Sequence, residues 1–128
     1  MLANGDAHLK NWSLLYEDQV TPMLFPAYDI VTINVYIENG SEFALNLGAK
    51  LNKTKKWLIV SYAHFENWAN KSGIPWRAIK PHLDDTMEKS RSLWPEALKN
   101  LPMDELHKES LENHWKNLQA DFRIESKE

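Results

Sequence analysis

Two side chains near the start of the chain could take part in one reaction. Asp6 and Asn11 are five residues apart in the stretch Asn4-Gly5-Asp6-Ala7-His8-Leu9-Lys10-Asn11. A carboxylate can accept the proton of an attacking hydroxyl, and an amide oxygen can be a ligand for a hard cation such as Mg²⁺. Because the two residues are so close in the chain, one rigid loop could hold a general base beside a metal ligand.

A second acidic ligand is expected, since Mg²⁺ usually takes one or two carboxylates together with phosphate oxygens and water. Asp29 is the candidate. Trp12–Tyr16 and Met23–Phe25 have the composition of two short strands, and the polar segment Glu17–Pro22 between them is typical of a turn. If these strands pair as a hairpin, the second strand returns the chain to the loop and brings Asp29 near Asn11.

The spacing D-x-x-x-x-N is that of the catalytic loop in protein kinases, where the Asp accepts the substrate hydroxyl proton and the Asn binds magnesium. Two residue types at one spacing also occur by chance. The alternative interpretation is that Asn4-Gly5 forms a type I′ turn and that Asp6 caps a nearby segment.

The rest of the chain has the pattern of helices that could support such a loop. A first helix is predicted from Lys53, with Thr54 as its cap and Ser72-Gly73 at its end. Pro75 is predicted to open a second helix, because a proline in the first turn loses no hydrogen bond. The apolar stripes repeat every three to four residues: Leu58, Tyr62, Phe65 and Ala69 in the first helix, and Trp76, Ile79, Leu83, Met87, Ser90 and Trp94 in the second.

Two further segments follow the second helix. Pro95 and Pro102 are expected to bracket a short, separate segment, and a last helix is predicted from Asp104. Its stripe consists of Leu111, Trp115, Leu118 and Phe122. The residues after it, 123–128, are mostly polar, and we expect them to fray.

The predicted fold class is α+β and predominantly helical. A small β-hairpin region at the N-terminus would pack on a C-terminal subdomain of three to four helices, with Phe43–Leu47 as a further strand or extended segment. We expect residues 1–128 to form a single domain, in which residues 1–52 carry the loop and residues 53–128 form the helical subdomain.

Composition excludes several classes of protein. Hydrophobic residues make up 43% and charged residues 26% of the 128 residues, which is typical of a folded chain and not of a disordered one. The absence of cysteine excludes disulfides, thiolate metal sites and a cysteine nucleophile. No apolar run is long enough to span a bilayer and no secretory leader is visible, so we expect a cytoplasmic protein.

Charge and histidine content point to no other site. The net charge is −3, and residues 1–50 hold only two basic residues beside six acidic ones, so there is no general nucleic-acid footprint. The small basic cluster Lys53, Lys55 and Lys56 is interpreted as a solvated helix end, with nucleic-acid contact as the alternative. His107 and His114 are seven residues apart without a third ligand, which favours packing or surface roles over zinc.

The string NGDAHLKN, followed by the apolar WSLLY and then by FPAYDIV, resembles the kinase core of HipA-type toxins, which are serine/threonine kinases of bacterial toxin–antitoxin systems. The resemblance is specific over residues 4–31. It continues weakly through Leu47-Gly48-Ala49-Lys50 into the helical region.

The resemblance implies a role for each matching residue. Asp6 would be the catalytic base, Asn11 and Asp29 would be the magnesium ligands, and Lys10 would lie near the phosphates of ATP, where its charge could stabilise the transferred group. His8 is expected to hold the loop by packing and hydrogen bonds. Tyr28, beside Asp29, is expected to shape the metal-binding turn.

The resemblance also implies cofactors and partners. They are Mg²⁺ and ATP, a protein substrate such as an aminoacyl-tRNA synthetase, and a helix-turn-helix antitoxin through which DNA would be contacted only indirectly. In this family the parts that cradle ATP lie before the catalytic loop, and here only five residues precede Asp6. We therefore expect a C-terminal fragment that is inactive alone. The alternative is a non-catalytic module that binds an antitoxin, a separate N-terminal lobe or itself.

Overall fold

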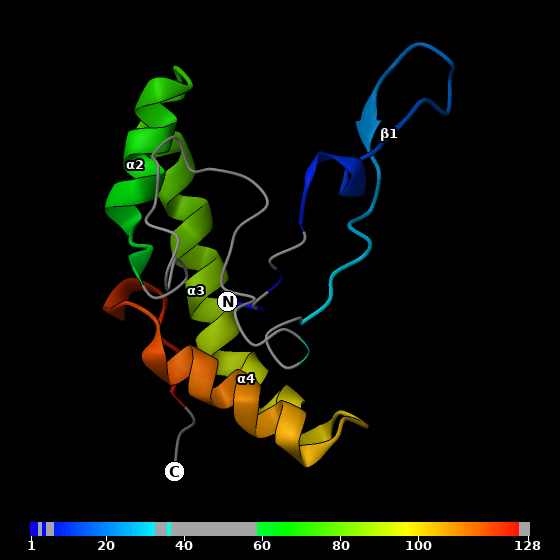
Figure 1. Ribbon diagram of the computed structural model, residues 1–128. Helices are drawn as coiled ribbons and strands as arrows, with labels where there is room; N and C mark the ends of the chain where they lie inside the picture. Colours follow the sequence, from blue (N-terminus) through cyan, green and yellow to red (C-terminus); the bar gives the residue numbers. More distant parts are fainter. Residues whose placement is uncertain (3, 5–6, 33–35, 37–58, 126–128) are drawn as a thin grey trace.

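The computed structural model describes residues 1–2, 4, 7–32, 36 and 59–125 (Figure 1). Along the chain come the 3₁₀ turn η1 (Leu9–Asn11), the strands β1 (Leu14–Leu15) and β2 (Met23–Leu24), the helices α2 (Tyr62–Lys71), α3 (Trp76–Asn100) and α4 (Glu105–Asn117), and the 3₁₀ turn η2 (Ala120–Phe122). The described residues therefore have the predicted α+β, predominantly helical fold. The expected strand Phe43–Leu47, the Lys53–Lys56 cluster and the boundary between residues 52 and 53 lie outside the described residues.

The predicted hairpin is confirmed. β1 and β2 pair antiparallel, with Leu14 opposite Leu24 and Leu15 opposite Met23. The turn between them is held by the carboxylate of Asp18, which accepts hydrogen bonds from the backbone N–H of residue 20 at 3.0 Å and of Thr21 at 2.6 Å. These bonds, together with one from the Thr21 hydroxyl, lower the pKa of Asp18 to about 2.

The first predicted helix is interrupted before α2, and its expected start at Lys53–Thr54 lies outside the described residues. Ile59 is helical, but Ser61 is extended, with φ −135° and ψ 173°, so α2 begins only at Tyr62. Two side chains fix this start: Ser61 N–H donates to His64 Nδ1 at 3.2 Å, and Tyr62 N–H donates to the Asp121 carboxylate at 2.8 Å. The predicted end is confirmed by Gly73, whose φ of +70° suits glycine.

The expected break at Pro95 is wrong, because α3 runs without interruption from Trp76 to Asn100 and contains both Pro81 and Pro95. A proline inside a helix costs roughly 3 kcal/mol. Pro95 is itself buried, and Leu98 one turn later is only 3% exposed. Burial of such side chains, worth roughly 1.5–3 kcal/mol each, offsets the cost of continuing the helix.

The last helix begins as predicted, with Asp104 accepting a hydrogen bond from the N–H of residue 106 at 2.9 Å. The expected fraying after Phe122 is wrong for residues 123–125. Ile124 is 1% exposed, and the Arg91 guanidinium on α3 donates to the carbonyl oxygens of Ala120, Asp121 and Arg123 at 2.9–3.2 Å. Residues 118–125 therefore form a strap fastened across α3, and residues 126–128 lie outside the described residues.

The core lies between α3, α4 and the strap. Its buried side chains are Val60, Met87, Leu98, Leu111, Trp115, Leu118, Phe122 and Ile124. The predicted stripes supply Met87 from α3 and Leu111 and Trp115 from α4. Leu118 and Phe122, which the sequence pattern places in the same stripe of the last helix, are buried but lie after the end of α4 at Asn117. The indole N–H of Trp115 donates to the backbone oxygen of Met1 at 3.0 Å, which ties the start of the chain to α4.

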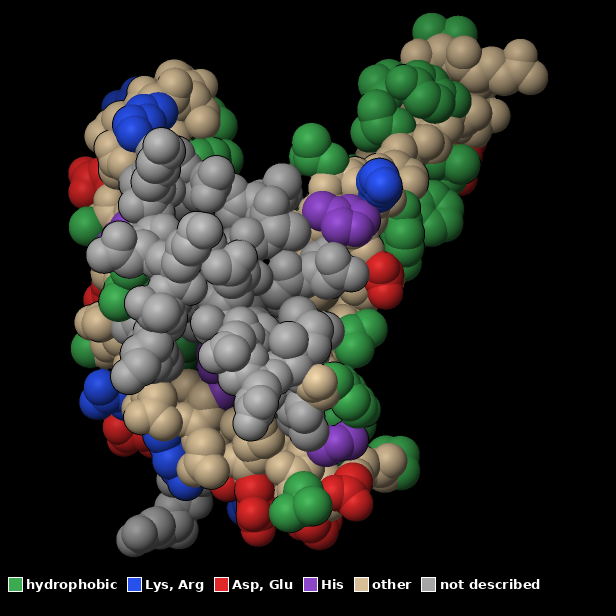
Figure 2. Space-filling view, viewed as in Figure 1, with side chains coloured by type: hydrophobic (Ala, Val, Ile, Leu, Met, Phe, Trp, Pro, Cys, Tyr) green, Lys and Arg blue, Asp and Glu red, His purple; other side chains and the backbone are tan. Residues whose placement is uncertain are grey.

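The expected packing of the hairpin on the helices is wrong, because β1 and β2 project away from the helical body (Figure 1). Hydrophobic side chains gather over it (Figure 2), and all four strand residues are exposed by 37–64%. Both faces of the two-stranded sheet are thus open, whereas an isolated two-stranded hairpin is only marginally stable in water. Among the described helices, none is long and apolar enough to cross a membrane.

Candidate functional site

The predicted loop is described at Asn4 and from Ala7 onward, and it closes into the turn η1. Asn11 N–H donates to the His8 carbonyl at 3.0 Å, and Trp12 N–H donates to the Leu9 carbonyl at 3.2 Å. The turn buries Asn11, which is 8% exposed, although Leu9 before it is 74% exposed. The backbone of the loop therefore directs one polar side chain inward.

Asn11 and Asp29 are in direct contact, as the hairpin predicts. The Asn11 Nδ2 group donates a hydrogen bond to Asp29 Oδ2 across 18 residues of chain. Asp29 has φ +55°, in the left-handed region that aspartate tolerates better than most residues. The Asn4 side-chain amide donates to the backbone oxygen of Asp29 at 3.2 Å, which helps to hold this turn.

The oxygen atoms of the pair fit a hard cation. Asn11 Oδ1 is buried and accepts no hydrogen bond from any described residue. Burying such an acceptor without a partner costs roughly 1–3 kcal/mol, which a bound cation would offset. An amide oxygen beside a carboxylate is the donor set that Mg²⁺ prefers, so these residues suit the predicted metal. The described residues contain no group of three or more His, Cys, Asp or Glu that could hold another metal.

A small pocket opens over the pair, with a volume of about 210 Å³. Its lining residues are Asn4, Ala7, Asn11, Trp12, Ala27, Tyr28, Asp29 and Ile30. Sites that enclose a small organic ligand usually measure roughly 300–1,000 Å³. The described residues alone thus offer room for an ion and part of a ligand rather than for a whole nucleotide.

The other predicted site residues are placed less fully. Asp6 lies outside the described residues, although its neighbour Ala7 lines the pocket, and its role stays a prediction. Lys10 is exposed, and its backbone carbonyl accepts a hydrogen bond from the Tyr28 hydroxyl at 2.9 Å. The backbone carbonyl of His8 closes the turn, and the expected role of its side chain stays a prediction.

Sequence analysis missed Ser13 as a member of the site. Its hydroxyl lies 2.8 Å from that of Tyr28, and its carbonyl accepts a hydrogen bond from Phe25 N–H at 2.8 Å. The only signal in the sequence is a polar residue two positions after Asn11, at the edge of an apolar strand. That signal is too common to be specific.

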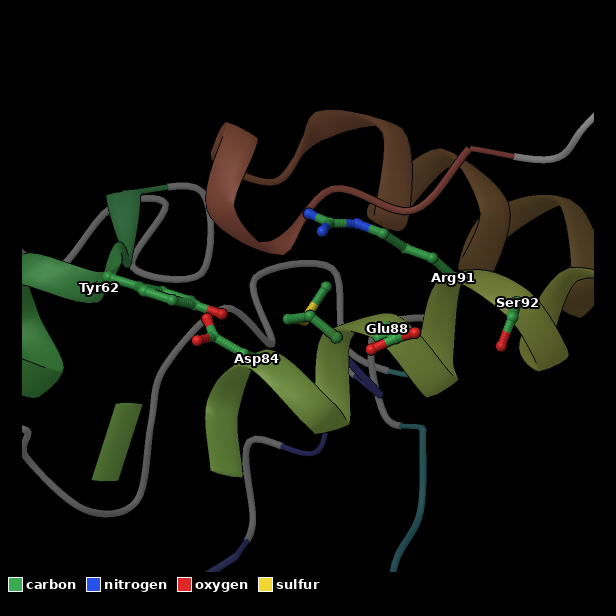
Figure 3. Close-up of a pocket in the computed structure, with 6 residues that line it drawn as sticks. Tyr62, Asp84, Glu88, Arg91 and Ser92 are labelled. Carbon is green, nitrogen blue, oxygen red and sulfur yellow. The ribbon is translucent and has the colours of Figure 1, made fainter. Parts of the chain in front are cut away.

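A second pocket, of about 400 Å³, lies on the helical body and contains none of the predicted site residues (Figure 3). Tyr62 and Asp84 point toward one another across it. The Lys80 ammonium lies 2.6 Å from the Asp84 carboxylate, and this hydrogen bond is the main reason that the pKa of Asp84 is lowered. Arg91, on its rim, is occupied by the strap. The polar groups here are used in structural contacts.

The two histidines of α4 pack rather than form a ligand pair. The His107 ring lies 5.3 Å from the ring of Tyr36, edge to face. Burial, helped by the charge of the N-terminal amine, lowers the pKa of His114 to about 4.

Comparison with known proteins agrees with the geometry of the loop and hairpin. Residues 1–94 match the family model described as the HipA-like C-terminal domain. The chain is 36% identical over 114 residues to the protein named "Putative kinase Y4dM" of Sinorhizobium fredii strain NBRC 101917 / NGR234. The aligned residues cover 89% of this chain and 27% of that protein. It is 35% identical over 51 residues to "Putative kinase Y4mE" of the same strain, with 40% and 12% covered. No solved structure matches the chain.

These matches support a kinase-like class of protein. The chain belongs to the HipA-like C-terminal domain family. It spans about a quarter of the length of the first relative, and the family match includes the loop, the hairpin, α2 and most of α3.

Proposed function

We propose that this chain supplies the catalytic loop and the metal ligands of a HipA-type serine/threonine kinase, which transfers the γ-phosphate of ATP to a protein hydroxyl. The observation that carries the proposal is the contact between Asn11 and Asp29, in which the buried oxygen Asn11 Oδ1 accepts no hydrogen bond from any described residue. Membership of a kinase-like family supports the same reaction.

Each of the four proposed site residues would have its own role in the transfer of the phosphoryl group. Asn11 and Asp29 would hold Mg²⁺, which when bound neutralises charge on the phosphate oxygens. Asp6 would accept the proton of the substrate hydroxyl while that oxygen bonds to the γ-phosphorus and the bond to the bridging oxygen breaks. Lys10, whose side chain is exposed beside the pair, would place a positive charge near the phosphates.

The proposal includes weak binding of Mg-ATP by this chain alone. The pocket of about 210 Å³ over Asn11 and Asp29 is too small to enclose a nucleotide. The relatives are several times longer, so the remaining contacts to ATP would come from other parts of such a kinase.

The substrate and partners are proposed from the family resemblance. The substrate would be an aminoacyl-tRNA synthetase or another protein with an exposed serine or threonine, in the cytoplasm. A helix-turn-helix antitoxin would bind the kinase and provide the indirect contact with DNA.

The proposal can be tested by replacing the matched quarter of the Sinorhizobium Y4dM protein with this chain. The graft should incorporate phosphate from γ-labelled ATP as the unmodified relative does. Asp6→Asn should reduce turnover by about 10²–10⁴-fold while ATP binding stays nearly unchanged. Asp29→Asn should weaken Mg-ATP binding as well as turnover, and Glu17→Gln, at an exposed position in the hairpin turn, is the matched control. Full activity in both site variants would contradict the proposal.

A second candidate function is a non-catalytic interaction module. The observation that favours it is the exposed apolar hairpin, whose strands have both faces uncovered. Under this proposal the hairpin would bind an antitoxin, a separate lobe or a second copy of the chain, and the loop residues would be unused. Activity of the graft that depends on Asp6 and Asp29 would decide for the kinase.

A further inference from the structure

Two hydrogen bonds link three groups that belong to residues close to Asn11 or Asp29 in the chain. The Tyr28 hydroxyl donates to the Lys10 carbonyl at 2.9 Å and lies 2.8 Å from Ser13 Oγ. A tyrosine hydroxyl carries one proton, and a carbonyl cannot donate. Because that proton goes to Lys10, the bond with Ser13 must be donated by the serine. The Ser13 hydroxyl, the Tyr28 hydroxyl and the Lys10 carbonyl thus form a directed chain.

These two hydrogen bonds hold the loop at residues on both sides of Asn11. The Lys10 carbonyl belongs to the peptide group that leads into Asn11, and Ser13 follows two residues later. Tyr28 is also the residue directly before Asp29, whose carboxylate accepts from Asn11. One side chain therefore joins the segment that carries the amide oxygen to the segment that carries the carboxylate.

We infer that the Ser13–Tyr28 hydroxyl pair is a positioning device that sets the distance between Asn11 and Asp29. The device is needed because neither segment is held by a packed core: Tyr28 is 39% exposed, and Phe25, which contacts its ring edge to face at 6.0 Å, is 43% exposed. Asp29 also has a left-handed backbone, which favours relaxation if the contacts are lost. The inference rests on the proposed function only in taking Asn11 and Asp29 as metal ligands.

The first test needs no metal. In the isotope-labelled 128-residue chain, the side-chain amide signal of Asn11 reports its bond to Asp29. Tyr28→Phe and Ser13→Ala should shift this signal toward that of a solvent-exposed amide, whereas Ser13→Thr, which keeps a hydroxyl, should restore it. Tyr16→Phe is the control, since the Tyr16 hydroxyl has no hydrogen bond to any described residue. An unchanged Asn11 signal in both Tyr28→Phe and Ser13→Ala would overturn the inference.

The second test titrates the same variants with Mn²⁺, which probes metal binding by Asn11 and Asp29. Loss of one exposed hydrogen bond should weaken Mn²⁺ binding by roughly threefold to tenfold. The double variant of Tyr28 and Ser13 should be no weaker than either single variant, because both act through one chain of bonds. Additive losses, or an equal loss in Tyr16→Phe, would overturn the inference.

The tests separate the two proposals. If Mn²⁺ does not bind the unaltered chain at Asn11 and Asp29, the metal ligands of the proposed function are wrong, and the amide signal alone decides on the positioning device. The circular dichroism of the helices should be the same in every variant, because the hairpin lies outside the helical core.

Discussion

Ile124→Ala should destabilise the folded chain far more than its place in a polar tail suggests. The side chain is 1% exposed and belongs to the core cluster with Trp115 and Phe122. Truncating a fully buried isoleucine to alanine costs roughly 2–5 kcal/mol, and the cost is larger where the surroundings cannot collapse into the cavity. The three bonds from Arg91 to strap carbonyls hold the backbone in place. We therefore expect a loss of about 3–4 kcal/mol.

The assay is urea unfolding followed by helical circular dichroism. With a denaturant slope of roughly 2 kcal/mol/M, the midpoint should fall by about 1.5–2 M. Leu106→Ala is the matched control, since Leu106 is 72% exposed and its truncation should change stability by less than about 0.5 kcal/mol. Equal midpoints for the two variants would refute the packing of residues 118–125 against α3.

Three other outcomes follow from the structure. The exposed pair Leu14 and Leu24 should make the chain self-associate at high concentration, and changing both to Thr should shift sedimentation toward monomer; a strictly monomeric unaltered chain would contradict this. Because burial lowers the pKa of His114 from 6.5 to about 4, the unfolded chain takes up a proton that the folded chain does not, and stability should fall as pH drops from 6.5 to 4. His114→Gln should flatten this slope in urea unfolding; an identical slope in the variant would be evidence against a buried neutral histidine. Asp104→Ala should cost about 1 kcal/mol through loss of the helix cap, measured in the same way, and no change would show that the cap is not formed.

The elements that could be predicted from sequence are those set by local patterns. The hairpin follows from two short apolar runs around a polar turn, and its pairing brings Asp29 back to Asn11. The period of 3.6 residues gave the buried stripes of α3 and α4, including Met87 and Trp115.

The elements that could not be predicted depend on residues distant in the chain. α2 begins at Tyr62 partly because Asp121, 59 residues later, accepts its N–H. α3 continues through Pro95 because burial in the core outweighs the local cost of a proline. Ile124 lies between two charged residues, and no periodicity indicates that Arg91 on α3 will bind the backbone directly before it.

In the candidate site, too, one contact could be predicted from local sequence patterns and another could not. The contact of Asn11 with Asp29 follows from the loop spacing and the hairpin, both of which are visible in the sequence. The bond between Ser13 and Tyr28 joins two hydroxyls 15 residues apart and belongs to no repeating pattern. Such a contact depends on the register of the hairpin and on side-chain direction, which the sequence does not specify by itself.

The most direct test of Asn11 and Asp29 as metal ligands is paramagnetic broadening by Mn²⁺ in the isotope-labelled 128-residue chain. At the lowest Mn²⁺ concentrations, signal loss should be centred on Asn11 and Asp29, because these two side chains are in direct contact and are the proposed metal ligands. Asp29→Asn should abolish this local broadening, and Glu17→Gln, which removes an equal charge at an exposed position in the hairpin turn, should leave it in place. Broadening that is centred elsewhere, or that persists in Asp29→Asn, would contradict the assignment of Asn11 and Asp29 as metal ligands.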